Sequence, residues 1–176
     1  MISNNKYLTQ GEMESNAKEI YTYLSDKGWT INAISGLLGN MQRESTINPG
    51  LWQSLKEDNY SGGYGLVQWT PATKYTNWAK ANRYDIGDGT GQLYWIDQLS
   101  ESTGEWIKTS AYNLTWSQFK TSTETPEYLA SAYLKNFERA GVEEEEARRQ
   151  YARSWYDFLE SGVEPAGRYI VRFIPT

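Results

Sequence analysis

Carboxyl groups are the side chains through which this sequence could do acid–base chemistry. The 176-residue chain contains no histidine and no cysteine, which excludes imidazole and thiolate metal sites, Ser-His-Asp and Cys-His nucleophiles, and disulfides. The Asp85–Gly91 stretch is rich in Asp and Gly, but it fits neither an EF-hand loop nor a dinucleotide-binding loop. The sequence therefore predicts no metal and no cofactor, and it leaves proton transfer to 22 Asp and Glu residues.

Glu44 stands out among these acids because it follows an apolar helical stretch. Thr30 is a typical N-cap residue, and the apolar positions after it recur at helical spacing as far as Met41. Glu44 lies seven residues after Leu37, two turns along the same row of side chains, so we expect it to face inward at the helix end.

An inward-facing carboxyl at that position would suit proton donation. Burial and the negative end of the helix dipole both favour the neutral acid. A neutral carboxylic acid is what a glycosidase uses as its general acid. From position alone, an equally good interpretation is a carboxylate at Glu44 that only accepts hydrogen bonds from the following loop.

A glycine-rich segment after this helix carries groups that suit a sugar site. Residues 62–69 read Gly-Gly-Tyr-Gly-Leu-Val-Gln-Trp. Glycines let the backbone approach a ligand, the Gln68 amide can donate and accept hydrogen bonds, and Tyr64 and Trp69 offer rings for stacking. Aromatic residues make up 15% of the chain, which also fits a Trp-rich core.

Helices are the elements that must position these residues. Capping residues and apolar spacing predict helices over 9–28, 30–44, 70–82, 93–99, from 115, 125–141 and from 143. Residues 45–69 carry turn signals that predict a long loop and a small β-hairpin. Gly36 and Gly39 would let a neighbouring element approach the central helix closely. The charge run near the last helix is interpreted as a solvated face, with the i, i+4 pairs Glu144–Arg148 and Glu145–Arg149.

The size and charge of the chain limit its class. We expect one domain over residues 1–161, with a linker or C-terminal extension over 162–176 that includes the isolated β-type stretch Tyr169–Ile174. The first ten residues hold no apolar run, so we expect neither a signal peptide nor a membrane span. A net charge of −5 argues against nucleic acid as a partner.

Several stretches in order resemble one known family. Gly39–Ser45 is followed some twenty residues later by Gly65–Thr70, which together resemble the Glu-Ser plus Gly-Leu-x-Gln pattern of the lysozyme and lytic transglycosylase superfamily. Asn48–Trp52, Gly63–Pro71 and Phe137–Arg139 extend the likeness to the phage tail lysozyme family, including the lysozyme domain of tail knob proteins. The resemblance covers roughly residues 10 to 160.

The resemblance implies a mainly α (α+β) lysozyme-like fold with the substrate cleft between the helices and the hairpin. By carry-over, Glu44 would be the general acid that protonates the glycosidic oxygen between N-acetylmuramic acid and N-acetylglucosamine in peptidoglycan. Gln68 would bind the adjacent sugar, and Tyr64 and Trp69 would line the cleft, with core packing as the alternative for Trp69. Trp52 and Tyr60 are weaker candidates of the same kind.

Two further acids enter through the family's mechanism. Glu138 matches the late Phe-Glu-Arg motif and would contact substrate or hold a structural or positioning role. Lysozymes add a second carboxylate, for which Glu57 is the first choice and Asp58 the other acid between Glu44 and Gln68. A separation from Glu44 of about 5–5.5 Å would imply retention of configuration, and about 6.5–9.5 Å inversion. If neither Glu57 nor Asp58 lies close to Glu44, a lytic transglycosylase that forms 1,6-anhydro ends is the better hypothesis.

The expected setting is a bacteriolytic hydrolase of a phage tail, made in the host cytoplasm and acting on the cell wall as part of the virion. Peptidoglycan glycan strands are the expected partner, together with other tail proteins or a following peptidase domain. A catalytically silent peptidoglycan-binding module is the alternative from another functional class.

Overall fold

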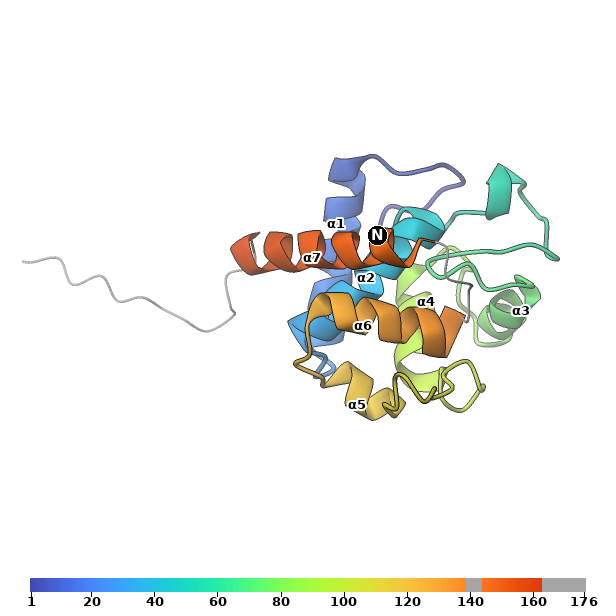
Figure 1. Ribbon diagram of the computed structural model, residues 1–176. Helices are drawn as coiled ribbons and strands as arrows, with labels where there is room; N and C mark the ends of the chain where they lie inside the picture. The colour runs from blue at the N-terminus through green and yellow to red at the C-terminus, as the bar shows by residue number, and fades with distance from the viewer. Residues whose placement is uncertain (139–143, 163–176) are drawn as a thin grey trace, which may run out of the picture.

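A central helix, α2 (Ile31–Ser45), organises the structure. In the computed structural model, which describes residues 1–138 and 144–162, α2 packs against α1 (Gln10–Ser25), α6 (Pro126–Tyr133) and α7 (Glu145–Gly162) (Figure 1). The Thr30 hydroxyl accepts a hydrogen bond from the Ala33 N–H and so begins the helix. Every residue from Ala33 to Met41 is buried, which confirms the prediction of a central, mostly buried helix.

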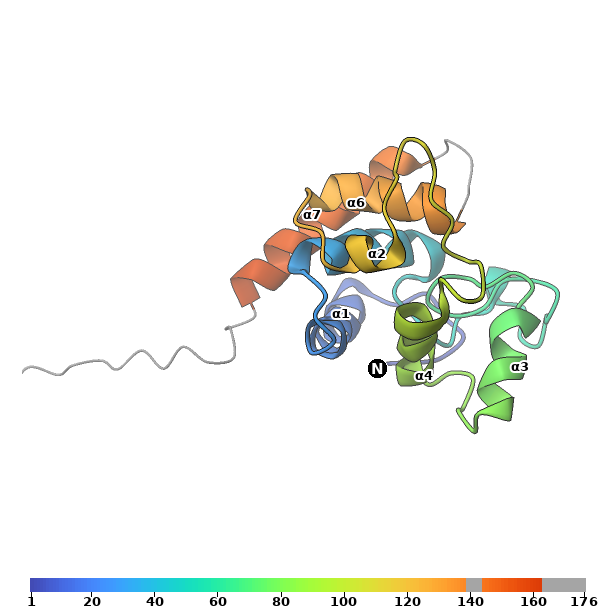
Figure 2. The same ribbon diagram turned by 90° about the horizontal axis from the view of Figure 1, so that it is seen from below.

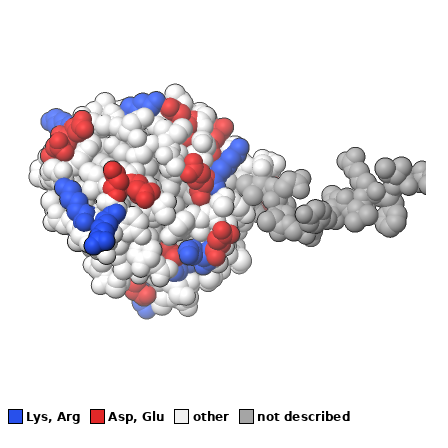
Figure 3. Space-filling view, turned by 180° about the vertical axis from the view of Figure 1, so that it is seen from behind, with Lys and Arg blue, Asp and Glu red and all other residues white. Residues whose placement is uncertain are grey.

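The other helices are short and surround α2. They are α3 (Thr73–Ala81), α4 (Gly89–Tyr94), α5 (Trp116–Lys120), the 3₁₀ turn η1 (Gln53–Leu55) and the π-helical turns η2 (Trp95–Leu99) and η3 (Leu134–Glu138), which continue α4 and α6. In Figure 2, α6 and α7 lie on one side of α2 and α1 and α4 on the other. None of the described helices combines the length and the apolar character needed to cross a bilayer. On the face in Figure 3, acidic and basic side chains are interspersed.

Two glycines allow α6 and α7 to pack directly on the backbone of α2. A Cβ atom at Gly39 would lie 2.5 Å from the Arg148 carbonyl oxygen and 2.8 Å from the Ala152 nitrogen. At Gly36 it would lie 2.9 Å from the Leu129 Cβ. All three distances are too short for a real side chain, so the expected close approach at these glycines is confirmed.

The predicted small β-hairpin is wrong. Between residues 52 and 69 the chain makes two isolated antiparallel bridges, Trp52 with Tyr64 and Tyr64 with Trp69. The described residues contain no β-strand beyond these single-residue bridges. Tyr64 and Trp69 exchange two backbone hydrogen bonds of 3.2 and 3.0 Å. Gly65 (φ 83°) and Gln68 (φ 50°) adopt left-handed backbone in the turn between these two residues. The ladder does not continue outward to Gly62 and Pro71, because proline has no N–H and the Gly62 carbonyl accepts from the Ala72 N–H (2.8 Å) instead.

Other expectations are corrected or fall outside the described residues. The helix expected from Thr70 begins at Thr73 instead, because the Thr70 hydroxyl donates to the Gln68 carbonyl (2.9 Å) rather than capping a helix. The expected helix end at Gly141, the stretch Tyr169–Ile174 and the extension over 163–176 lie outside the described residues.

We predict that Gly39→Ala destabilises the fold, since the new methyl group meets the α7 backbone. Overpacking of this kind costs about 1–3 kcal/mol, which corresponds to a fall in Tm of about 2–12 °C for a chain of this size. Gly11→Ala is the matched control, because it is also a helical glycine but its Cβ would meet nothing within 4 Å. Equal Tm values for the two variants in thermal unfolding followed by circular dichroism would contradict the close packing of α7 on α2.

Candidate active site

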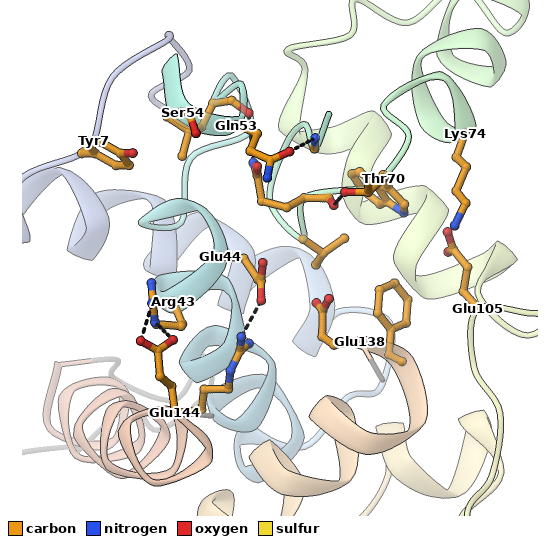
Figure 4. A pocket seen from close by; sticks show the side chains of 17 residues that line it. Tyr7, Arg43, Glu44, Gln53, Ser54, Thr70, Lys74, Glu105, Glu138 and Glu144 are labelled. Carbon is orange, nitrogen blue, oxygen red and sulfur yellow. Dashed lines mark hydrogen bonds and ion pairs between the residues drawn. The ribbon is translucent and has the colours of Figure 1, made fainter. Parts of the chain in front are cut away.

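A cleft of about 700 Å³ opens at the C-terminal end of α2 (Figure 4). Its walls come from the loop between α2 and α3, from η3 and from the start of α7, and its lining includes Glu44, Gln68, Trp69, Glu105, Glu138 and Arg148. The volume is typical of a ligand site. The cleft therefore brings together residues that lie more than one hundred positions apart in the sequence.

Glu44 lies in this cleft and is held by a buried arginine from α7. The Glu44 side chain is 21% exposed, and its Oε1 accepts a hydrogen bond of 2.5 Å from Arg148 Nη2. Arg148 Nη1 also donates to Asn40 Oδ1 at 3.0 Å. The Asn40 amide in turn donates to the backbone carbonyls of Gly36 and Ala130, each at 3.0 Å. One amide thus links α2, α6 and the arginine that fixes the Glu44 carboxyl group.

The structure corrects the ion pairs expected in the charge run, Glu144–Arg148 and Glu145–Arg149. Glu144 precedes α7 with φ 69° and forms an ion pair with Arg43 instead. Glu145 pairs with Lys135 at 3.3 Å. Because Glu144 lies outside the helix, the i, i+4 spacing does not apply to it.

Sequence reasoning missed Arg148 as a site residue. A signal was present, because Arg148 begins the row of buried α7 positions that continues through Ala152, Trp155 and Leu159. An arginine on an apolar stripe needs a buried acidic or polar partner. Because Arg148 lies four residues after Glu144, the sequence suggested an ion pair on the helix surface, and the need of Arg148 for a buried partner was overlooked.

Glu138 presents a second carboxyl group to the cleft from the π-helical turn η3. Its Oε1 atom is buried, and no described group forms a hydrogen bond with it. Burial raises the pKa of Glu138 well above its usual value, the negative charge of Glu44 raises it further, and Arg148 opposes the shift. The shift favours the protonated form of Glu138, which can donate a hydrogen bond to a bound molecule. The π-helical turn that carries it is a feature often found at functional sites.

The structure does not bring Glu57 or Asp58 to Glu44. Both residues are exposed, and neither lines the cleft. A different acid, Glu105, reaches the cleft from the segment after η2 and accepts a hydrogen bond of 2.7 Å from Trp95 Nε1. No sequence motif singled out Glu105, because its position depends on how the segment after η2 folds back.

Gln68 lines the cleft with its amide group already oriented. Its Nε2 donates to the carbonyl oxygens of Leu51 and Gly65, each at 3.0 Å. Both amide hydrogens are thereby used. The side-chain oxygen is the part of the amide that these bonds leave available to accept a hydrogen bond from a ligand.

The aromatic rings predicted to stack on a sugar are buried against other aromatic rings. Trp69 lines the edge of the cleft but is only 3% exposed, and it stacks on Tyr75 with ring centroids 4.6 Å apart. Tyr64 is 2% exposed, packs against Trp52 at 4.4 Å and does not line the cleft. Trp52 is likewise buried, and Tyr60 packs edge-on against it. The placement of these rings fits the core-packing interpretation.

Comparison with known proteins identifies relatives of the chain. The family model described as phage tail lysozyme matches residues 15–159. Morphogenesis protein 1 of Bacillus phage B103 is 43% identical over 171 residues, which cover 97% of this chain and 46% of that protein. The chain therefore spans about half the length of this curated relative.

We predict that wild-type protein loses stability relative to Glu138→Gln as the pH rises above about 4.5. Since the raised pKa keeps the proton on folded Glu138 while the unfolded chain ionises, the folded state binds more protons, and stability falls with pH. The difference in free energy of unfolding should change by at most about 1.4 kcal/mol per pH unit.

Urea denaturation at pH 5 and pH 8 measures this effect. Glu57→Gln removes an exposed acid and is the control, for which we expect no comparable dependence on pH. A constant difference in unfolding free energy between wild type and Glu138→Gln at the two pH values would contradict the neutral state of Glu138.

Proposed function

The chain belongs to the phage tail lysozyme family, and we propose that it cleaves peptidoglycan glycan strands as an N-acetylmuramidase. The observation that carries the proposal is the position of Glu44, which projects into the cleft from the end of the central helix and is held by Arg148. The absence of histidine and cysteine leaves carboxyl groups as the means of proton transfer.

In this proposal, Glu44 protonates the glycosidic oxygen between N-acetylmuramic acid and N-acetylglucosamine. The C1–O bond breaks, its electron pair goes to the leaving oxygen, and positive charge develops at C1 and the ring oxygen. Glu44 becomes a carboxylate, and Arg148 Nη2, 2.5 Å away, is placed to compensate the new charge. A water molecule then adds to C1 and returns a proton to Glu44.

Gln68 and Glu138 supply polar contacts of opposite kinds in the proposed complex. The Gln68 side-chain oxygen accepts a hydrogen bond from a sugar hydroxyl or acetamido N–H, because its amide hydrogens are bound to Leu51 and Gly65. Neutral Glu138 donates a hydrogen bond to an oxygen of the sugar. Together they orient the sugar pair at Glu44.

A lytic transglycosylase is the second candidate, favoured by the positions of Glu57 and Asp58. Both lie on the surface outside the cleft, so neither is placed to act as the second carboxylate of a retaining or inverting lysozyme. In the transglycosylase reaction the C6 hydroxyl of the same muramic acid attacks C1, and no water is consumed. The 1,6-anhydro product therefore weighs one water less than the hydrolysis product.

The proposed setting is the tail of a phage virion. The relative from Bacillus phage B103 is named a morphogenesis protein, and the family model is that of tail lysozymes. Mass spectrometry of purified virions and isolated tails tests this placement. The proposal expects the chain in the isolated tails and not only in the lysate.

We predict that Glu44→Gln retains the fold and its Tm but abolishes solubilisation of purified cell walls, because an amide cannot donate the proton. Turbidity loss of a cell-wall suspension measures the activity. Glu101→Gln replaces an exposed acid outside the cleft and is the matched control, which should clear walls like the wild type. Clearing by Glu44→Gln at the wild-type rate would refute the assignment.

The mass of the released muropeptides decides between the two reactions. Hydrolysis predicts reducing muramic acid ends, and transglycosylation predicts ends lighter by one water. If wild-type protein binds walls but releases neither product, the silent binding module is correct and both enzymatic proposals are wrong.

A further inference from the structure

One aromatic ring at the cleft is open to solvent. Tyr7 lines the cleft and is 58% exposed, whereas Tyr64 and Trp69 are 2% and 3% exposed. Among the described large apolar and aromatic side chains that are exposed, Tyr7 is the most exposed. Figure 4 places its ring at one end of the opening, on the side away from Lys74 and Glu105.

The residues on both sides of Tyr7 form hydrogen bonds with the segment after α2. The Asn48 side-chain amide donates to the carbonyl oxygens of Asn4 (2.7 Å) and Lys6 (2.6 Å). The Leu8 N–H donates to Thr46 Oγ1 at 2.9 Å. These bonds bracket Tyr7 and tie its backbone to the end of the helix that carries Glu44. The ring is therefore presented from a preorganised backbone, which reduces the entropy lost on binding a ligand.

The surface is hollowed on both sides of Tyr7. A second hollow of about 520 Å³ shares Tyr7, Arg43, Glu44 and Glu144 with the cleft and extends to Tyr151 on α7. The Arg43–Glu144 ion pair stands where the two hollows meet, with the two side chains 43% and 47% exposed. The groove thus continues beyond Glu44, past an exposed ring and a charged pair.

We propose that Tyr7 is a stacking platform for a sugar ring of the glycan strand beyond the pair of sugars that is cleaved at Glu44. The proposal rests on the glycosidase function proposed above and extends it along the strand. A pyranose ring has an apolar C–H face, which an open aromatic ring can cover, and polar edges, which need hydrogen-bond partners. Arg43 and Glu144 supply such partners next to Tyr7.

Size and chemistry favour a glycan over a small ligand in this groove. The cleft and the second hollow share Glu44 and Tyr7, so the hollowed surface continues on both sides of the proposed proton donor. The lining is mainly polar and charged, with one open ring, so it suits a hydroxyl-rich chain. A strand that lies across Glu44 therefore meets Tyr7 next.

The test measures binding in the Glu44→Gln background, so that turnover does not interfere. The probe is peptide-free glycan strands from purified peptidoglycan, separated by length, and the affinity is measured by isothermal titration calorimetry. We expect Tyr7→Leu to weaken binding of long strands by about two- to tenfold, the range expected for one aromatic contact. Tyr7→Phe keeps the ring and should bind like its parent. Disaccharide fragments should bind the Tyr7→Leu variant and its parent equally.

Tyr94→Leu is the matched control. Tyr94 is also an exposed tyrosine (39%), but it lies outside both hollows and stacks on Trp78. We expect its loss to leave glycan affinity unchanged. Tyr7 and Tyr94 variants should also unfold at similar temperatures to the parent, since exposed side chains contribute little to stability.

The outcomes separate this proposal from the function on which it rests. Unchanged affinity of Tyr7→Leu for long strands overturns the platform and leaves the glycosidase proposal intact. An equal loss for disaccharides and long strands also overturns it, because Tyr7 would then contact the cleaved pair itself. If the Glu44→Gln parent binds no glycan of any length, both proposals fail together.

Discussion

The close crossing of α2 and α7 at Gly39 is the contact on which the site depends. Because no side chain separates the two backbones, the Arg148 carbonyl lies against Gly39 and the Arg148 guanidinium reaches Asn40 and Glu44. Asn40 extends the same contact to α6 through its bond to Ala130. A methyl group at residue 39 would therefore move the charge partner of Glu44 as well as lower stability.

Two carboxyl groups in one cleft have different surroundings. Glu44 is partly open to solvent and bonded to an arginine, whereas the Glu138 Oε1 is buried without a hydrogen-bond partner and the pKa of Glu138 is raised. Differences of this kind are how enzymes assign separate roles to chemically identical groups. Here the different surroundings of the two carboxyl groups come from where each helix ends. Glu44 lies in the last turn of α2, and Glu138 is the last residue of η3.

Most of the aromatic side chains pack against one another in the core, and few of them line the cleft. Trp69, Tyr75 and Trp95 pack together beside the loop that carries Gln68. A separate cluster of Trp29, Trp106, Trp116 and Phe119 lies under the helical side. Rings packed in this way are covered by one another and cannot also cover a ligand. The stacking surface therefore falls to Tyr7, which comes from a segment with no recognisable motif.

The sequence by itself determined the helical class, the central helix, the two close-packed glycines and the position of Glu44 at a helix end, because capping, periodicity and spacing are local properties. It placed Gln68 beside that end through a motif. It failed on the hairpin, where Pro71 has no N–H to continue the pairing of Tyr64 with Trp69. The acids that it offered as a second carboxylate, Glu57 and Asp58, lie exposed outside the cleft. The tertiary structure was needed to show that Arg148 holds Glu44, that the Oε1 atom of Glu138 is buried and that Tyr7 is open. These properties depend on contacts between segments far apart in the chain. A local pattern can indicate that a residue such as Arg148 needs a buried partner, but it does not specify which residue that partner is.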